Sequence, residues 1–266
     1  MTLPPKIFDH KILLKNRNRS IANFNKSNFI HKFISDIIFD IILDQKHNFK
    51  KILEIGAMDN YLSKIIKDNF IESDIFSSEI SPKWSKLNND YSKIIMNDEF
   101  ISFKKNSFDL ICSNLNAHFY NDLLGFLIQS HYCLKNNGLF IASFIGNDSF
   151  KLLKDIFQKI ELEKYQRFTS RFIPTTDIKT AGMLMQKAGF KDIISLSEEI
   201  NIDYNDPKKI LTDIKQSGGS NIMFNRSKKF MTSDFINNIY NHLNKSKIND
   251  KININLNIII ILGYKN

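Results

Sequence analysis

Apolar and polar positions along the chain predict short strands alternating with helices. The runs suited to buried strands are short, apolar and bounded by turn residues. They lie at residues 52–55, 74–79, 92–96, 108–113, 139–144, 192–202 and 252–264. Segments with helical spacing separate them, so we expect an α/β, Rossmann-like fold. Its mostly parallel, seven-stranded sheet should carry helices on both faces and right-handed crossovers.

Two segments stand outside this alternation. Residues 1–47 read as an N-terminal arm followed by a leading helix, because apolar residues recur at helical spacing over 28–43 and Ser27 is a plausible cap. Within this arm, residues 6–25 are basic and polar, which favours an exposed helix or an irregular segment. Residues 48–266 form the expected main domain, with a helical insertion at about 205–250, between the last two strands, that could cover a pocket.

Composition narrows the function only a little. The net charge of +9 over 266 residues would suit nucleic acid or an anionic membrane, but scattered Lys in an Ile- and Asn-rich chain favours biased codon usage. Cys112 and Cys133 form no metal or disulfide pattern, so we expect buried thiols and no metal. No apolar run reaches the length of a membrane span, and the first residues lack a signal-peptide core. A cytoplasmic location is expected, with peripheral contact at the inner membrane left open.

The stretch 51–60 is the clearest candidate for a binding site. The apolar run Ile52-Leu53-Glu54-Ile55 breaks at Gly56, and a helical pattern begins at Tyr61. A strand that turns at a glycine into a helix lets the backbone approach a nucleotide and points the helix N-terminus at it. Ligands in such sheets lie beyond the carboxyl ends of the strands. The other expected strand ends carry Glu79, Asn97, Asp98, Asn114 and His118.

Several stretches support a family resemblance. They include Asp98-Glu99-Phe100-Ile101-Ser102-Phe103, Ser113-Asn114-Leu115-Asn116-Ala117-His118-Phe119, Gly146-Asn147-Asp148-Ser149, Gly219-Ser220-Asn221 and Gly263-Tyr264. With them, the chain resembles the class I S-adenosylmethionine (SAM)-dependent methyltransferases. Within that superfamily it is similar to the branch of mitochondrial complex I assembly factor five and its alphaproteobacterial relatives. A more distant resemblance is to the malonyl-carrier-protein methyltransferase of biotin synthesis.

The resemblance implies SAM as the cofactor and roles for the residues at the strand ends. Glu54, Gly56, Ala57 and Met58 would lie near the methionine end of SAM. Glu79 would accept hydrogen bonds from the ribose hydroxyls, although a solvated acid at a strand end is the alternative. The adenine amino group would be bound by Asn97 or by Asp98. Asn114 would lie where substrate and sulfonium meet, and His118 would contact the substrate or move a proton, unless it is a structural histidine.

One departure from the family pattern concerns the glycine loop. The usual Gly-x-Gly-x-Gly has only Gly56 here, with Met58 and Asn60 in the other two positions. Asn60 tolerates left-handed backbone, but Met58 places a side chain where the ligand normally touches bare backbone. The hypothesis is that SAM affinity is weakened or lost.

Two functions of different classes follow. The first is a SAM-dependent modifying enzyme, most simply a methyltransferase. Its acceptor would be the complex I iron–sulfur subunit by resemblance, or a small-molecule or carrier-protein acceptor. The second is a non-catalytic complex I assembly factor with a degenerate pocket. Arginine hydroxylation, the activity of the mitochondrial member, rests on the resemblance alone, because no two-histidine, one-carboxylate pattern occurs. A nucleic-acid methyltransferase lacks supporting motifs.

Overall fold

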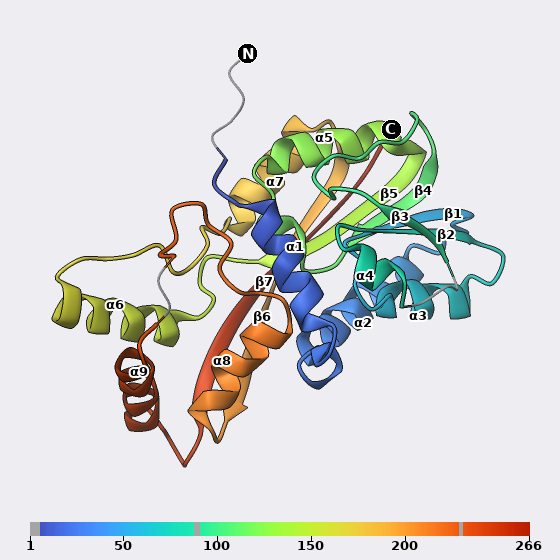
Figure 1. The fold of residues 1–266 in the computed structure, drawn as a ribbon. Helices are drawn as coiled ribbons and strands as arrows, with labels where there is room; N and C mark the ends of the chain where they lie inside the picture. Colours follow the sequence, from blue (N-terminus) through green and yellow to red (C-terminus); the bar gives the residue numbers. More distant parts are fainter. Residues whose placement is uncertain (1–5, 88–90, 229–230) are drawn as a thin grey trace.

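The computed structural model describes residues 6–87, 91–228 and 231–266. Residues 1–5 of the expected arm and 229–230 of the expected insertion lie outside this range. Among the described residues, seven strands form one sheet in the order β3-β2-β1-β4-β5-β7-β6 (Figure 1). β7 runs antiparallel to both of its neighbours, and the other pairs are parallel. The strands are β1 (Lys51–Ile55), β2 (Asp74–Glu79), β3 (Ser92–Ile95), β4 (Phe108–Ser113), β5 (Leu134–Ile145), β6 (Lys191–Tyr204) and β7 (Ile252–Tyr264). The expected α/β fold with a mostly parallel sheet is confirmed.

Helices cover both faces of this sheet. The helices of the described residues are α1 (His10–Ser20), α2 (Phe29–Asp44), α3 (Tyr61–Asn69), α4 (Pro82–Ser85), α5 (Leu123–Cys133), α6 (Lys151–Tyr165), α7 (Ile178–Lys187), α8 (Pro207–Gln216) and α9 (Ser233–Lys245), and α2, α3, α5 and α7 pack on the faces of the sheet. Short 3₁₀ turns lie at η1 (Phe24–Lys26) and η2 (Ala117–Phe119). Side chains alternate along each strand, so β1 points Leu53 towards α5 and α7 and Ile52 towards α2 and α3. Two apolar layers therefore bury the central strands β1, β4 and β5 on both sides.

The beginning of β5 differs from the expected element. Because Asn136-Asn137-Gly138 is typical of a helix stop, the strand was expected only over 139–144, whereas β5 begins at Leu134. The register with β4 shifts by several residues between Phe108 and Leu110, and the polar residues 135–138 lie within this irregularity. A bulge accommodates extra residues without ending the strand, which the local turn signal does not reveal.

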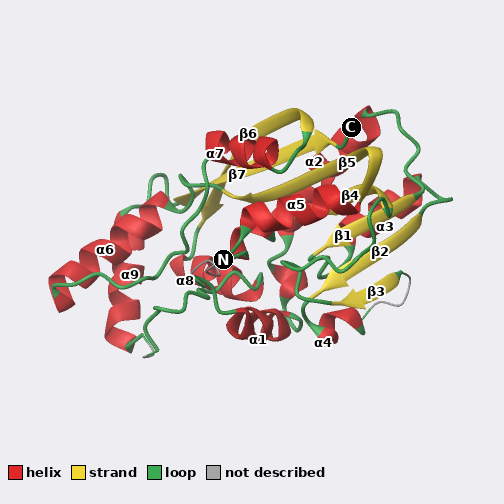
Figure 2. Cartoon of the chain, turned by 90° about the horizontal axis from the view of Figure 1, so that it is seen from above, coloured by secondary structure: helices red, strands yellow, loops and turns green. Residues whose placement is uncertain are grey.

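The N-terminal segment is not exposed, contrary to expectation. Within its helix α1, the side chains of Leu13, Asn16 and Arg17 are almost completely buried. α1 contacts both α4 and α8, and Figure 2 shows it lying along the same side of the molecule as those helices. Ser27 is also not the cap of the following helix, because its hydroxyl donates to Asp213 of α8 instead. The polar residues of this segment are thus partners for polar groups elsewhere in the fold.

The insertion between β6 and β7 carries α8 and α9, as expected. Apolar side chains of α6, α8 and α9 pack with the beginning of β7 in a cluster of their own, which includes Ile210, Phe235 and Ile252. Figure 1 shows α6 and α9 projecting from one end of the sheet. Among the described residues, no helix combines the length and apolar character needed to cross a membrane.

Candidate functional site

The turn after β1 brings backbone and side chains of three strands together. Gly56 has a φ of +76°, in the left-handed region that favours glycine. The backbone N–H groups of Gly56 and Ala57 both donate to the carbonyl of Ser78 at 3.0 Å, which joins the turn to β2. Met58 and Asn60 also have positive φ values, of 38° and 58°. The left-handed backbone of a glycine loop is therefore kept although two of its residues are not glycine.

Glu79, at the end of β2, is held by groups from three segments. Its carboxylate lies 3.1 Å from Nη1 of Arg17 and accepts the backbone N–H of Met58 at 3.3 Å. The backbone N–H of Ser81 donates to its other oxygen at 3.1 Å. Arg17 and Glu79 are 2% and 4% exposed, so this ion pair is almost fully removed from water. A carboxylate can accept hydrogen bonds from hydroxyl groups, but here Arg17 and two backbone N–H groups already donate to it.

Asn116 connects this ion pair with a second buried carboxylate. Its Oδ1 accepts from Nη2 of Arg17, and its Nδ2 donates to Asp98 at 3.0 Å and to the Tyr120 hydroxyl at 2.7 Å. Burial, and then the nearby Glu79 carboxylate, raises the pKa of Asp98 to about 7. A Cβ on Gly56 would lie 2.0 Å from Nδ2 of Asn116. The Asn116 side chain therefore rests directly on the glycine.

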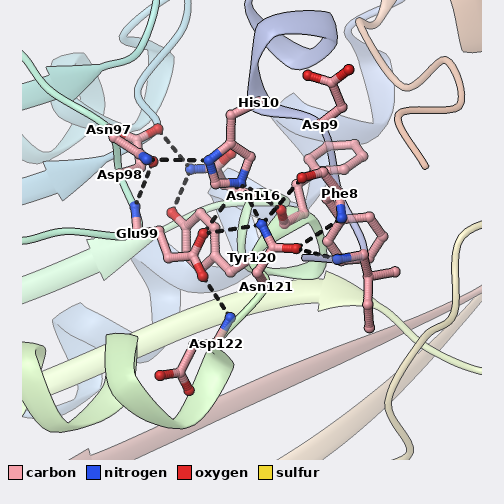
Figure 3. Close-up of polar contacts among 12 residues, drawn as sticks. Phe8, Asp9, His10, Asn97, Asp98, Glu99, Asn116, Tyr120, Asn121 and Asp122 are labelled. Carbon is pink, nitrogen blue, oxygen red and sulfur yellow. Dashed lines mark hydrogen bonds and ion pairs between the residues drawn. The ribbon is translucent and has the colours of Figure 1, made fainter. Parts of the chain in front are cut away.

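The start of the described chain is fastened to the same edge of the sheet (Figure 3). Oδ1 of Asn121 accepts the backbone N–H groups of Ile7 and Phe8 at 2.7 and 2.8 Å. The ring of His10 lies 3.2 Å from the Glu99 carboxylate and 3.1 Å from the Asn97 amide. The N-terminal segment thus holds Asn97 and covers the region beside Asp98.

Two predicted site residues make their contacts elsewhere. Glu54 accepts from the backbone N–H of Ser63 at 3.0 Å and from the Ser63 hydroxyl, so its side chain faces α3. Burial raises the pKa of Glu54 to about 8. Asn114 donates to the His31 carbonyl at 2.7 Å and to the Ser35 hydroxyl at 2.8 Å, which ties the end of β4 to α2. Neither residue shares a hydrogen bond with Arg17, Asp98 or Asn116 among the contacts of the described residues.

His118 lies in a buried position beside an internal cavity. The ring is 9% exposed, and burial, together with Arg17, lowers the pKa of His118 to about 3. The imidazole is therefore neutral in the physiological pH range. Met58 and Arg17 line the same cavity, which places its inner end next to the turn after β1.

Two residues of this site, Asn116 and Arg17, were not among the predicted site residues. Asn116 follows Asn114 in the loop after β4, so its position at a strand end was a usable signal. Arg17 lies in a segment with little apolar periodicity and more than thirty residues before β1. Sequence spacing alone carried no indication that this arginine would meet Glu79.

Comparisons with known proteins agree with this geometry. Residues 53–142 match the protein family described as Methyltransferase domain. A YcgJ protein from Bacillus subtilis has a solved structure similar to this one, with a TM-score of 0.56 at 15% identity, covering 82% of this chain and 93% of that one. Residues 53–142 are therefore similar to a methyltransferase domain, and the sheet has the Rossmann-like fold of the class I methyltransferases.

Relatives of known name extend the comparison beyond this domain. Human mitochondrial arginine-hydroxylase NDUFAF5 is 29% identical over 226 residues, which cover 83% of this chain and 65% of that protein. A putative methyltransferase of Rickettsia prowazekii is 29% identical, over 73% of this chain and 85% of its own length. A malonyl-[acyl-carrier protein] O-methyltransferase of Gallionella capsiferriformans is 22% identical, over 85% and 80%. The expected resemblance is confirmed.

The hydrogen-bond acceptors at the strand ends suit SAM, but the protein's own side chains occupy the site in this structure. Glu79 and Asp98 offer buried oxygens for hydroxyl and amino groups, and the turn at Gly56 offers bare backbone. In this structure Arg17 holds Glu79, and Asn116 covers Gly56. These two side chains must move before a nucleotide cofactor can reach either group.

Proposed function

We propose that this protein is a SAM-dependent methyltransferase. The observation that carries the proposal is the convergence of Glu79, Asp98 and the turn at Gly56 at one edge of a sheet with methyltransferase topology. When bound, SAM supplies a methyl group on a positively charged sulfur. Methyl transfer from such a sulfur depends mainly on positioning, so the protein needs a rigid cradle more than a strong acid or base.

The proposed roles follow the positions of the side chains. Glu79 binds the ribose hydroxyls, and Asn97 or Asp98 binds the adenine amino group. Gly56, Ala57 and Met58 shape the side of the site that receives the methionine part, and Glu54 supports this turn from below by accepting hydrogen bonds from Ser63 of α3. Asn114 acts by holding α2 against β4, beside the place where acceptor and cofactor meet. His118 is neutral and can hydrogen-bond an acceptor, but its pKa of about 3 makes it a weak base, so a role in proton transfer is the less favoured one.

SAM titration by calorimetry tests the proposal. Wild-type protein should bind SAM, and Glu79→Gln should weaken binding by about 10- to 100-fold, since a hydrogen bond to a charged group contributes about 1.5–3 kcal/mol. Asp74→Asn is the matched control, because Asp74 lies at the other end of β2 and is exposed. Failure of the wild-type protein to bind SAM, or equal effects of both variants, would contradict the proposal.

The second candidate is a non-catalytic assembly factor with a degenerate cofactor site. It is favoured by the Arg17–Glu79 pair and by Asn116 on Gly56, because both fill the cradle with the protein's own side chains. The resemblance to the branch of complex I assembly factor five suggests work on respiratory complex I. In either case the proposed location is the cytoplasm, and peripheral contact at the inner membrane stays open.

Mass spectrometry of the complex I iron–sulfur subunit separates these roles. A strain lacking the protein should lose one methylene mass if the subunit is methylated, or one oxygen mass if arginine hydroxylation is retained. A subunit of unchanged mass together with failed assembly supports the scaffold. A fully assembled, unchanged complex would rule out the complex I role and leave a small-molecule or carrier-protein acceptor.

A further inference from the structure

One long edge of the sheet has no partner strand. β6 spans 14 residues and, among the described residues, pairs along one side only, with β7. Figure 2 shows it at the opposite edge of the sheet from β3, with α7 beside it. The other edge strand, β3, has four residues. Proteins usually keep edge strands short or place charges on them, because unpaired N–H and C=O groups attract further strands.

The middle of β6 lacks those protections. The stretch Ile193-Ile194-Ser195-Leu196-Ser197 contains neither a charged residue nor a proline. Ile194 and Leu196 lie on the same face as the buried β7 residues opposite them, yet they are 50% and 40% exposed. Exposed apolar side chains and unpaired backbone groups therefore occur together on this part of the edge.

A groove follows the same stretch on the other face of the sheet. It lies between α7 and the beginning of β6 and has a volume of about 660 Å³. Its wall includes Ile178 and Met183 of α7, which are 38% and 50% exposed, and also Gly182 and Ile193. A neighbouring element with apolar side chains can fill this groove while its backbone pairs with β6.

We propose that β6 pairs antiparallel with β6 of a second copy of this chain, about a two-fold axis at Ser195. The two sheets then join into one. In this register Ile194 of one copy stands opposite Leu196 of the other, and the contact occurs twice. The axis is perpendicular to the sheet, so both α7 helices lie on the same face. There Ile178 and Met183 of each copy meet at the groove.

A bulge in β6 makes the charges agree with this register. Lys191 and Ile194 stand opposite Tyr264 and Leu262 of β7, so β6 holds one residue more than β7 between these pairs. The extra residue turns Lys191 to the face of Ile194. The register then sets Lys191 of one copy opposite Glu198 of the other. Opposite charges that face each other across two strands stabilise the pairing.

Other registers are less favourable. Moving the axis by one residue sets Leu196 opposite Lys191, or Ile194 opposite Glu198. An axis at Glu198 or at Glu199 sets two carboxylates opposite each other, which is destabilising. This match at one axis favours a second copy over an unrelated strand, whose charges would be under no such constraint.

Sedimentation velocity over the micromolar range tests the proposal. Wild-type protein should sediment with twice the chain mass of 31.1 kDa. Leu196→Glu should weaken dimerisation by about 100-fold, because it replaces the apolar contact with further carboxylates beside Glu198. Ile71→Glu is the matched control and should stay dimeric, since Ile71 is 75% exposed and lies in the turn before β2.

A charge exchange tests the register. Lys191→Glu and Glu198→Lys should each weaken dimerisation by about 10-fold, since each sets like charges opposite one another twice. The double variant should return the affinity to within about 3-fold of wild type. A purely structural defect of either single variant would not be reversed by the second substitution.

Cysteine cross-linking locates the axis. Oxidation of Ser195→Cys should give a disulfide-linked dimer, because the axis sets the two copies of this position opposite each other. Ser197→Cys is the matched control on the same face, since its two copies would lie about 13 Å apart. Cys112 and Cys133 are buried, so they do not compete for the cross-link.

Four results would overturn the proposal. These are a monomeric wild-type protein, a dimer that Leu196→Glu leaves unchanged, no recovery in the charge-exchanged double variant, and cross-linking at Ser197 instead of Ser195. The proposal does not rest on SAM binding, because β4, β5 and β7 separate β6 from β1. SAM binding by a monomer overturns only the dimer, whereas a dimer without SAM binding overturns only the methyltransferase.

Discussion

The guanidinium of Arg17 lies 3.1 Å from the carboxylate of Glu79, and both side chains are almost completely buried. The arginine comes from α1, outside the sheet, and the glutamate ends β2. One contact therefore joins the N-terminal helix to the residue that we propose binds the ribose of SAM. Arg17 therefore occupies the Glu79 carboxylate, which the proposed cofactor would need as a hydrogen-bond acceptor.

Replacing Arg17 should make that acceptor available. We expect Arg17→Met to bind SAM about 10-fold more tightly than wild type, because a charge-assisted hydrogen bond no longer has to be broken. Arg19→Met is the control, since Arg19 bonds to Asn16 and Ser220 and not to Glu79. Calorimetry measures the affinities. Weaker binding in Arg17→Met would show instead that the guanidinium contacts the cofactor.

Because Asn116 packs against Gly56, a single methyl group added at Gly56 should lower the stability of the protein considerably. Gly56→Ala should destabilise the protein by about 2–5 kcal/mol, from left-handed backbone strain and from the clash with Asn116. Urea unfolding should show a smaller cost for Gly56→Ala in an Asn116→Ala background. Gly219→Ala is the control, because its Cβ would have no neighbour nearer than 3.4 Å. Equal costs at both glycines would contradict the packing described here.

Glu54 should make stability fall as pH rises. Its pKa is about 8 when folded, against 4.5 as the ordinary value, so the folded protein holds a proton that the unfolded chain releases. The contribution of Glu54 to the free energy of unfolding is fully present below pH 4.5 and is lost between about pH 4.5 and pH 8. Its slope can reach about 1.4 kcal/mol per pH unit.

Glu54→Gln should remove the part of the pH dependence of stability that is due to Glu54. In this variant the stability should still decrease somewhat as pH rises, because the pKa of Asp98 is also raised, to about 7. Urea unfolding at several pH values measures the effect, and Glu72→Gln, at an exposed position, should keep the wild-type slope. A Glu54→Gln profile that parallels wild type would be inconsistent with a protonated Glu54.

Asn121 should control how firmly the N-terminal segment is held. Asn121→Ala removes the acceptor of the Ile7 and Phe8 N–H groups, so trypsin should cleave within α1 about 10-fold faster. Asn238→Ala is a matched control on α9, where the side chain bonds only within its own helix. Limited proteolysis followed by mass spectrometry measures the rates. Equal cleavage of both variants would mean that other contacts hold the segment.

Much of the fold was predictable from the sequence, and so was part of the site. Apolar runs of strand length alternate with helical spacing, and burying them on both faces leaves few arrangements other than a doubly wound sheet. Parallel strands place their carboxyl ends at one edge, so Gly56, Glu79 and Asp98 had to lie near one another. These inferences need only local pattern and topology.

The remaining contacts were decided by tertiary structure. α1 has few apolar residues, so its pattern predicted exposure, yet Arg17 and Asn16 are buried because polar groups of the core and of the insertion bind them. His31 and His118 come from α2 and from the loop after β4, and only packing places both beside one cavity. Hydrogen bonds between segments this far apart depend on side-chain directions in the folded state. Sequence spacing does not encode those directions.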